Sequence, residues 1–220
     1  MVKVSGVPYE VELDLPNVSF VWATEGMEGY IAAMARVSNP ENQDNPDYER
    51  LIRYLIKHQH WSPFEMVNVC MEINCTRDIA RQILRHRSFT FQEFSQRYAE
   101  AQQWDISEAR MQDNKNRQNS LETADKDTQR WWQEEQQKVL KQAKTAYSNA
   151  LKLGIAKEVA RKVLPEGLTM SKMYMNGTLR SWVHYVTLRS GNGTQKEHRL
   201  IAEQCKTILT DLCPTVMNSL

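Results

Sequence analysis

The fold is decided by residues 67–84, which read Val-Asn-Val-Cys-Met-Glu-Ile-Asn-Cys-Thr-Arg-Asp-Ile-Ala-Arg-Gln-Ile-Leu. The first half alternates apolar with mostly polar side chains, which is the period of a strand buried on one face. The second half places apolar side chains at Ile79, Ala80 and Ile83, the spacing of a helix whose N-cap would be Thr76. The stretch therefore predicts a strand that leads directly into a helix.

The same periodicities predict further elements on both sides of this stretch. Asp47 is a suitable N-cap for a helix with an apolar stripe, and Gly154 is a natural C′ residue for a long amphipathic helix. Ser62-Pro63-Phe64-Glu65 has the form of a capping box, although a strand pattern follows it. The other expected elements are one or two strands within 2–22, a helix over about 27–37, the long helix over about 127–153, a short helix over 156–164, mixed strand and helix signals over 168–188, and a closing helix over 196–212.

These elements indicate an α+β fold, in which a central, mostly antiparallel sheet is flanked by helices. A chain of 220 residues can bury one good core, so we expect residues 1–220 to form a single domain. Residues 105–130 fit either a mobile excursion or the polar start of the long helix. We expect Trp131 and Trp132 to serve packing.

The charge balance argues against a protein that coats long nucleic acid, because such proteins rely on many phosphate contacts. The chain has 28 basic and 27 acidic residues and a formal net charge of +1. No apolar run approaches the roughly 20 residues that a membrane span requires. A local cluster of charge on a nearly neutral chain suits a small anionic ligand better.

Metal binding and secretion are not indicated either. Cys70, Cys75, Cys205 and Cys213 follow no zinc-ligand spacing, even when the histidines at positions 58, 60 and 86 are considered with them. No signal-peptide pattern opens the sequence. We therefore expect no metal site, reduced thiols and a cytoplasmic location.

The lysine and arginine positions from Arg77 to Arg97 are all arginine, whereas residues 110–157 hold seven lysines against three arginines. A solvated surface has no reason to exclude lysine, but bidentate recognition of phosphate or carboxylate has one. Aromatic side chains that can stack on a planar ring lie between these arginines: Phe89, Phe91, Phe94 and Tyr98. The segment predicts a phosphate-and-ring site, most plausibly for a nucleotide.

Arg85-His86-Arg87 is the centre of this segment. Cations at the end of a helix complement its dipole, so a solvated basic helix end is one explanation of the tripeptide. Three adjacent basic residues also repel one another, and an anionic ligand would relieve that repulsion. The surrounding arginines and aromatic side chains favour the ligand site.

Glu93, Ser95 and Arg97 occupy alternate positions, so an extended backbone would point all three to one side. They would form either a ligand-binding row or an exposed polar strand face. Arg161, Arg180 and Arg189 lie in apolar stretches, where an arginine either extends its charge to solvent or is paired. If they converge with Arg85, they form a pocket for a dianion. The phosphate loops of Walker and Rossmann type are absent from the sequence, so arginines and helix ends would have to hold any nucleotide.

The spacing of Arg85-His86-Arg87, seven residues and then Ser95 resembles the signature of the flavin-dependent thymidylate synthases. Four other blocks, spread over most of residues 30–200, are similar to segments of that family: Ala35-Arg36-Val37-Ser38, His58-x-His60-x-Ser62-Pro63-Phe64-Glu65, Glu158-Val159-Ala160-Arg161 with Leu164-Pro165, and Leu179-Arg180-Ser181-Trp182-x-His184 with Leu188-Arg189.

The resemblance implies reductive methylation of dUMP to dTMP in de novo dTMP biosynthesis, with methylenetetrahydrofolate as carbon donor. It implies FAD, reduced by NADPH, and a homotetramer with sites at subunit junctions. The implied FAD-binding residues are Ser38, Ser62, Glu65, Arg85, His86, Arg87, Glu93, Thr178, Arg180 and His184. The implied dUMP-binding residues are Gln82, Arg85, Glu93, Ser95, Arg97, Arg161 and Arg189.

Arg189 would have the catalytic role. Carbon 5 of uracil is a poor nucleophile while the ring is neutral, and a guanidinium beside N3 would stabilise the ring anion. Carbon 5 could then attack the activated methylene without an enzyme nucleophile. Ser95 is assigned to binding and orientation, because the sequence places no histidine to deprotonate it.

Two alternatives remain open. Met66 stands where the family commonly has histidine, and Asn176-Gly177-Thr178 stands in place of the usual Gly-Asn. These departures are compatible with a flavin enzyme that acts on another pyrimidine nucleotide or adds another one-carbon group. A non-enzymatic RNA-binding module would also use arginines and stacked aromatic rings, but it leaves Glu93 and the neutral net charge unexplained.

Overall fold

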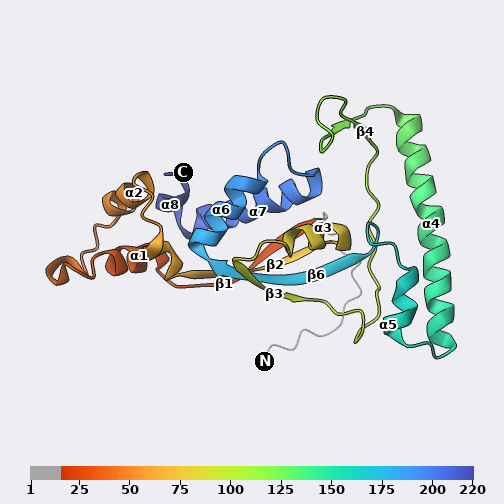
Figure 1. The fold of residues 1–220 in the computed structure, drawn as a ribbon, viewed down its shortest axis with the longest axis horizontal. Helices are drawn as coiled ribbons and strands as arrows, with labels where there is room; N and C mark the ends of the chain where they lie inside the picture. The colour runs from red at the N-terminus through yellow and green to blue at the C-terminus, as the bar shows by residue number, and fades with distance from the viewer. Residues whose placement is uncertain (1–15) are drawn as a thin grey trace.

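The computed structural model describes residues 16–220 (Figure 1). A four-stranded antiparallel sheet has the order β1-β2-β6-β3, formed by Asn17–Ala23, Asn68–Thr76, Met170–Thr178 and Phe89–Glu93. The predicted α+β fold with a mostly antiparallel sheet is confirmed. The part of the predicted N-terminal strands that precedes residue 16 lies outside the described residues.

The central pair of strands carries the core. β2 and β6 pair over nine positions, from Asn68 opposite Thr178 to Thr76 opposite Met170. The alternation predicted for residues 67–75 is confirmed, because Val69, Met71 and Ile73 are fully buried. Each strand passes directly into a helix, which is the arrangement that the sequence predicted for β2.

Three helices cover one face of the sheet (Figure 1). They are α3 (Arg77–Ile83), α6 (Leu179–Arg189) and α7 (Lys196–Leu212). Trp182 of α6 is fully buried, and its indole nitrogen donates a hydrogen bond of 2.9 Å to the carbonyl of Val69. This bond fixes the height of α6 over the sheet.

A second group of helices closes one end of the core. It consists of α1 (Met27–Ala35), a 3-10 turn over Pro40–Asn42, α2 (Glu49–Lys57), a 3-10 turn over Ser62–Glu65, and α8 (Pro214–Met217). Tyr48, not the predicted Asp47, is the N-cap of α2, and it makes no capping bond through its side chain. Asp47 instead offers its backbone carbonyl to the guanidinium of Arg36 at 2.6 Å, so the helix starts later than the sequence indicated. Thr76 occupies the predicted N-cap position of α3 but likewise makes no side-chain capping bond.

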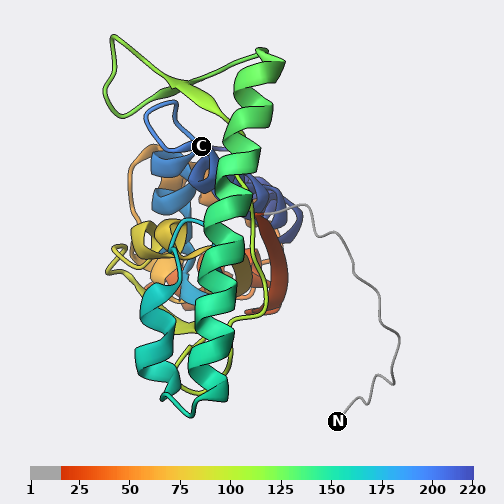
Figure 2. The ribbon, with the colours of Figure 1, turned by 90° about the vertical axis from the view of Figure 1, so that its right-hand side faces the viewer.

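The long helix α4 (Lys126–Lys152) extends along one side of the molecule (Figures 1 and 2). It confirms the prediction for residues 127–153. Its C-terminus is a Schellman motif: Gly154 has φ of 79°, its amide bonds the carbonyl of Leu151, and the amide of Ile155 bonds that of Ala150. The short helix that follows is α5 (Lys157–Ala160) with a 3-10 turn over Arg161–Val163.

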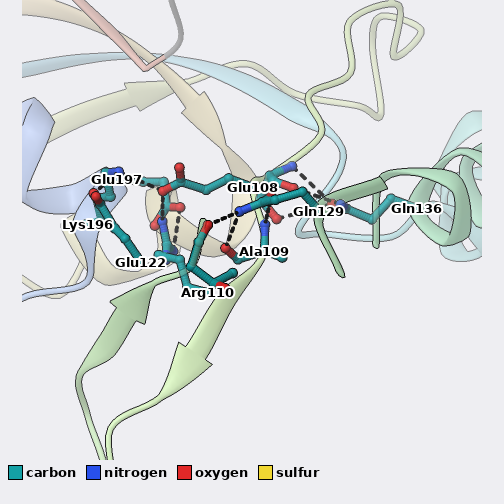
Figure 3. A network of polar contacts seen from close by, with 10 residues as sticks. Glu108, Ala109, Arg110, Glu122, Gln129, Gln136, Lys196 and Glu197 are labelled. Carbon is teal, nitrogen blue, oxygen red and sulfur yellow. Dashed lines mark hydrogen bonds and ion pairs between the residues drawn. The ribbon is translucent and has the colours of Figure 1, made fainter. Parts of the chain in front are cut away.

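Of residues 105–130, which we expect to be a mobile excursion or the polar start of the long helix, residues 126–130 do begin α4 and residues 105–124 form an excursion from it. They approach α4 as an extended segment that contains a hairpin of β4 (Arg110–Gln112) and β5 (Ser120–Glu122). Gln136 of α4 accepts a bond from the amide of Ser107 at 3.0 Å and donates one of 2.8 Å to its carbonyl, and Gln129 does the same for Ala109 (Figure 3). The side-chain amides of α4 thus make the backbone hydrogen bonds that a neighbouring strand would make. Hydrophobic periodicity in the sequence cannot reveal such pairing.

The two tryptophans that we expect to serve packing have different surroundings. Trp131 is 59% exposed, whereas Trp132 is 37% exposed and lines a cavity together with residues of α3 and α7. The two residues are adjacent on a helix and therefore point in directions about 100° apart, so they cannot both face the same neighbouring element.

Strand β3 is held against β6 by a contact that needs glycine. Phe89 lies directly opposite Gly177, and a Cβ built on Gly177 would lie 2.4 Å from the phenylalanine ring. That ring cannot move away freely, because it packs edge-to-face on Trp182 with ring centroids 4.9 Å apart. The glycine thus allows the ring to cover the backbone of β6.

We predict that Gly177→Ala lowers the free energy of unfolding by about 1–3 kcal/mol, because the added methyl overpacks this contact. Urea unfolding followed by tryptophan fluorescence measures the change. Gly167→Ala is the matched control, since a Cβ at Gly167 meets no atom within 4 Å. Equal stability of the two variants would contradict the role given to the Phe89 contact.

Candidate active site

The Arg85-His86-Arg87 tripeptide lies in the turn between α3 and β3. The amide of His86 bonds the carbonyl of Ile83, the last residue of α3. Arg85 and Arg87 are exposed, while His86 turns inward and is partly buried. The local sequence therefore presents two cations outward and one imidazole toward the core.

His86 meets Arg189, the last residue of α6. The Nε of Arg189 donates a hydrogen bond of 2.9 Å to Nε2 of His86. A guanidinium can only donate, so the ring nitrogen of His86 must accept and the imidazole must be neutral. Burial, together with the charges of Arg189, His184 and Arg85, lowers the pKa of His86 to about 4, which agrees with this geometry.

The arginines around this turn lack internal anions. Among residues 16–220, no carboxylate lies within ion-pair distance of Arg85, Arg87 or Arg189. Three cations beside a neutral histidine produce a positive potential that no carboxylate of residues 16–220 neutralises by an ion pair. Such a place binds an anionic ligand, as the sequence predicted.

A cavity of about 640 Å³ lies beside the same turn. It brings together three of the residues assigned to FAD: Glu65, Arg180 and His184. Glu65 and Arg180 form an ion pair across it, although 115 positions separate them in the sequence. The remaining lining residues are Trp61, Ser88, Ser181, Val183, Thr187 and Leu220.

Three other residues assigned to FAD have different surroundings. Ser62 is the exposed first residue of the 3-10 turn whose last residue is Glu65, and it does not itself line the cavity, although its neighbour Trp61 does. Thr178 is the N-cap of α6, where its hydroxyl accepts from the amide of Ser181 at 3.3 Å. Ser38 is exposed in the turn after α1, and no contact of the described chain joins it to the cavity.

The predicted row of Glu93, Ser95 and Arg97 is wrong. Strand β3 ends at Glu93, and the chain then turns, with the amides of residues 98 and 99 both bonded to the carbonyl of Ser95. An extended backbone would have been needed to align the three side chains. Only Glu93 keeps a strand position, where it accepts from Ser171 at 2.8 Å and pairs with Arg77 at 3.4 Å.

The distant arginines do not all converge within one chain. Arg189 reaches His86, and Arg180 reaches the cavity that Ser88 lines. Arg161 lies on the 3-10 turn after α5, on the side of the molecule where Arg97 pairs with Glu158 at 3.3 Å. The condition stated for a dianion pocket, convergence of all three with Arg85, is not met within one chain, because the 3-10 turn after α5 carries Arg161 away from α6.

Sequence reasoning missed a buried polar network behind His86. Tyr185 and His198 are both fully buried, and the ring of Tyr185 packs edge-to-face on His86 at 4.9 Å. Gln82, which was predicted, bonds both His198 and Gln195. A signal existed for His198: it lies on the apolar stripe of α7 that continues with Ile201, Ala202 and Cys205.

The geometry defines a class of protein: an enzyme-like site for a phosphorylated ring compound, built where two helix ends meet beside a cavity. Comparison with known proteins agrees. The family model described as "Thymidylate synthase complementing protein" matches residues 20–215. A protein of Synechocystis sp. described as a flavin-dependent thymidylate synthase is 50% identical over 210 residues, covering 96% of this chain and 97% of its own.

Two further similarities point the same way. A probable flavin-dependent thymidylate synthase of Paramecium bursaria Chlorella virus 1 is 50% identical over 195 residues, or 88% of this chain and 90% of its own. The crystal structure of a UMP/dUMP methylase, PolB from Streptomyces cacaoi, bound with 5-Br dUMP, has a TM-score of 0.83 at 26% identity and covers 92% of this chain and 93% of its own.

The chain therefore belongs to the thymidylate synthase complementing protein family, the flavin-dependent thymidylate synthases. Membership makes it a flavoprotein and a transferase of dTMP biosynthesis, as the resemblance implied. No helix within residues 16–220 is long and apolar enough to cross a bilayer.

The contact between Arg189 and His86 has a measurable electrostatic effect. We predict that Arg189→Gln raises the pKa of His86 part of the way from about 4 toward 6.5, because one nearby cation is lost while burial remains. A pH titration of the imidazole signals by NMR measures this change. Arg199→Gln is the control, since Arg199 bonds Asn192 and Glu203 instead.

The lowered pKa of His86 also determines how the stability of the folded protein changes with pH. The ordinary pKa of 6.5 exceeds that of folded His86, so the unfolded chain takes up this proton first as the pH falls. The contribution of His86 to stability is therefore lost between about pH 6.5 and 4. A His86 that titrates near pH 6.5 in the parent protein would contradict the geometry.

Proposed function

We propose that the enzyme transfers the methylene carbon of methylenetetrahydrofolate to carbon 5 of dUMP and reduces it to a methyl group, forming dTMP. One observation carries the proposal: the hydrogen bond of 2.9 Å between Arg189 and His86. It joins the arginine assigned to the pyrimidine ring with the histidine of the turn assigned to the flavin. Transfer of a hydride from the flavin to the carbon bound to the pyrimidine needs the flavin site and the pyrimidine site to be adjacent.

The residues around the cavity fit FAD. The cofactor is a dianion with planar ring systems, and the turn offers Arg85 and Arg87, which have no carboxylate partner among the described residues, beside a cavity of about 640 Å³. Glu65, Arg180, His184 and Ser62 would contact it there. When bound and reduced by NADPH, FAD supplies the hydride that completes the methyl group.

Arg189 would act on the pyrimidine ring. Its Nη nitrogens are left for a ligand, because the bond to His86 uses only Nε. Positive charge beside N3 lowers the pKa of the ring and raises the electron density at carbon 5. Carbon 5 would then form a bond to the activated methylene and lose its hydrogen as a proton. The bond from the methylene to the folate nitrogen would break, so that tetrahydrofolate leaves, and one hydride would complete the methyl group.

The residues assigned to dUMP lie in two separate places of one chain. Arg97 and Arg161, with Ser95, lie on the α5 side and make no contact with the turn of Arg85. A second copy could supply them, and the exposed Trp131 and Val139 of α4 offer apolar surface for association. We therefore propose a homotetramer with sites at subunit junctions, formed by chains that each act as one domain over 1–220.

Cellular location belongs to the same proposal. Cys70, Cys75, Cys205 and Cys213 are all free and buried. Burial raises the pKa of Cys75 to about 12, so its thiol stays protonated and unreactive. These features support a protein that works in the reducing cytoplasm.

A decisive assay uses the purified protein without oxygen, incubated with FAD, NADPH, methylenetetrahydrofolate and dUMP. Bleaching of the flavin absorbance together with dTMP formation is the expected result. Bound flavin without dTMP, but with product from dCMP or UMP, would transfer the proposal to another pyrimidine nucleotide. A protein that takes up no FAD would refute a flavin enzyme and return the arginine site to RNA binding.

We predict that Arg189→Lys lowers kcat for dTMP formation by at least about 100-fold. Lysine keeps the positive charge but loses the planar guanidinium, which must donate to His86 and to the ring at the same time. The flavin content and the rate of flavin reduction by NADPH should change little. Lys206→Arg, an exchange of the same two residue types on exposed surface, is the control. Near-normal turnover of Arg189→Lys would contradict the catalytic role.

A further inference from the structure

His198 is a buried titratable group that the proposed chemistry does not use. It lies on α7 with no solvent exposure, and both ring nitrogens have partners. Nε2 lies 3.1 Å from the hydroxyl of Tyr185, and Nδ1 lies 3.4 Å from the amide oxygen of Gln82. A histidine held at both nitrogens connects two elements, α6 and α3, through α7.

The placement of the Gln82 amide decides the tautomer. Its oxygen faces Nδ1 of His198, and an amide oxygen can only accept, so with this placement Nδ1 carries the hydrogen and donates to Gln82. The other nitrogen, Nε2, is then free to accept from the hydroxyl of Tyr185. Burial and the nearby charge of Arg189 lower the pKa of His198 to about 3, so the ring stays neutral and the arrangement persists at neutral pH.

The direction of these bonds continues beyond His198. Gln82 donates a hydrogen bond of 2.7 Å from its amide nitrogen to the side-chain oxygen of Gln195, the N-cap of α7. An amide can rotate by 180° and exchange its oxygen and nitrogen, and a histidine with its hydrogen on Nδ1 opposes that rotation, because the rotated amide would place an N–H against it. The second N–H of the Gln82 amide has no partner among the bonds of the described chain.

We infer that His198 is a positioning residue that fixes the Gln82 amide with an N–H directed to the substrate, so that the site selects a pyrimidine with a carbonyl oxygen over one with an amino group. The inference rests on the proposed function, in which Gln82 contacts the nucleotide. A fixed N–H donor pairs with O4 of uracil. It meets another donor, the 4-amino group, in cytosine, whereas a rotated amide would present its oxygen to that group.

The position of this network supports selection at the ring. Tyr185 and His198 both pack near His86, with centroid distances of 4.9 Å and 6.2 Å, and His86 holds Arg189. The groups assigned to O4 and to the N3 side of the pyrimidine ring, Gln82 and Arg189, thus rest on the same buried cluster. A residue at the base of this cluster can affect substrate choice without touching the substrate.

The test compares two substitutions of His198, one that removes the hydrogen-bond donor to Gln82 and one that retains a donor. His198→Leu removes the donor to Gln82, and His198→Asn retains a donor near the place of Nδ1. Lys206→Asn, on the exposed side of the same helix, is the control. Calorimetry with dUMP and dCMP on the FAD-loaded protein gives the ratio of their dissociation constants, and circular dichroism confirms folding.

We expect His198→Leu to reduce the preference for dUMP over dCMP by about tenfold or more, equivalent to one lost directional hydrogen bond. His198→Asn should retain most of the preference, and flavin reduction by NADPH should be unchanged in both. An unchanged preference in folded His198→Leu overturns the inference. A similar loss in Lys206→Asn also overturns it, because the effect would then be unrelated to the Gln82 contact.

A second measurement needs no variant and no turnover. Nitrogen-15 NMR of the parent protein should show the Nδ1–H tautomer for His198, with no titration between pH 5 and 8. The Nε2–H tautomer would overturn the inference even if His198→Leu fails to fold. If the parent protein forms no dTMP yet binds dUMP with this tautomer, the proposed reaction fails while the positioning role is retained.

Discussion

The pairing of β2 with β6 determines where everything else in the site can lie. The strands are antiparallel and pair over nine positions, and each continues without a loop into a helix on the same face of the sheet. The helices therefore start at opposite ends of the pair and run toward each other. At about 1.5 Å per residue, α3 and α6 cover roughly 10 and 16 Å of a strand pair roughly 30 Å long, so their C-terminal ends approach each other. His86 and Arg189 follow those ends, and this explains how residues 103 positions apart come into contact.

Electrostatics make the same place suitable for an anion. The C-termini of α3 and α6 carry partial negative charge, which offsets part of the repulsion among Arg85, Arg87 and Arg189. The remaining conflict is reduced because His86 is neutral and accepts a hydrogen bond from Arg189. A protonated imidazole at 2.9 Å would repel that guanidinium instead. The turn can thus gather cations on its outer side only because its inner residue holds no charge.

Local periodicity was sufficient to predict most of the fold. The strand over residues 67–75, the long helix over 127–153 and the Gly154 terminus all follow from patterns within a few neighbouring residues. Residues 105–124 were not predictable in this way, because Gln129 and Gln136 pair with their backbone from a distant helix. In the site, too, local motifs were predictable from the sequence, whereas contacts between distant segments were not. The Arg85 turn was visible as a motif, but the contact with Arg189 depends on the sheet register, and the partners of His198 depend on three helices packing together.

His86, which is partly buried, and His198, which is fully buried, leave Arg189 as the cation on the inner side of the turn. His86 and His198 both have a strongly lowered pKa, caused chiefly by burial, and Arg189 contributes to both shifts. Since neither imidazole is charged at neutral pH, Arg189 supplies the positive charge on the inner side of the turn. A second cation there would compete with Arg189 for an anionic ring and would weaken its hydrogen bond to His86. Neutral histidines instead fix the orientation of their neighbours through hydrogen bonds, so orientation and charge are supplied by different side chains. This separation lets Gln82 discriminate between rings while Arg189 stabilises negative charge on the ring that is bound.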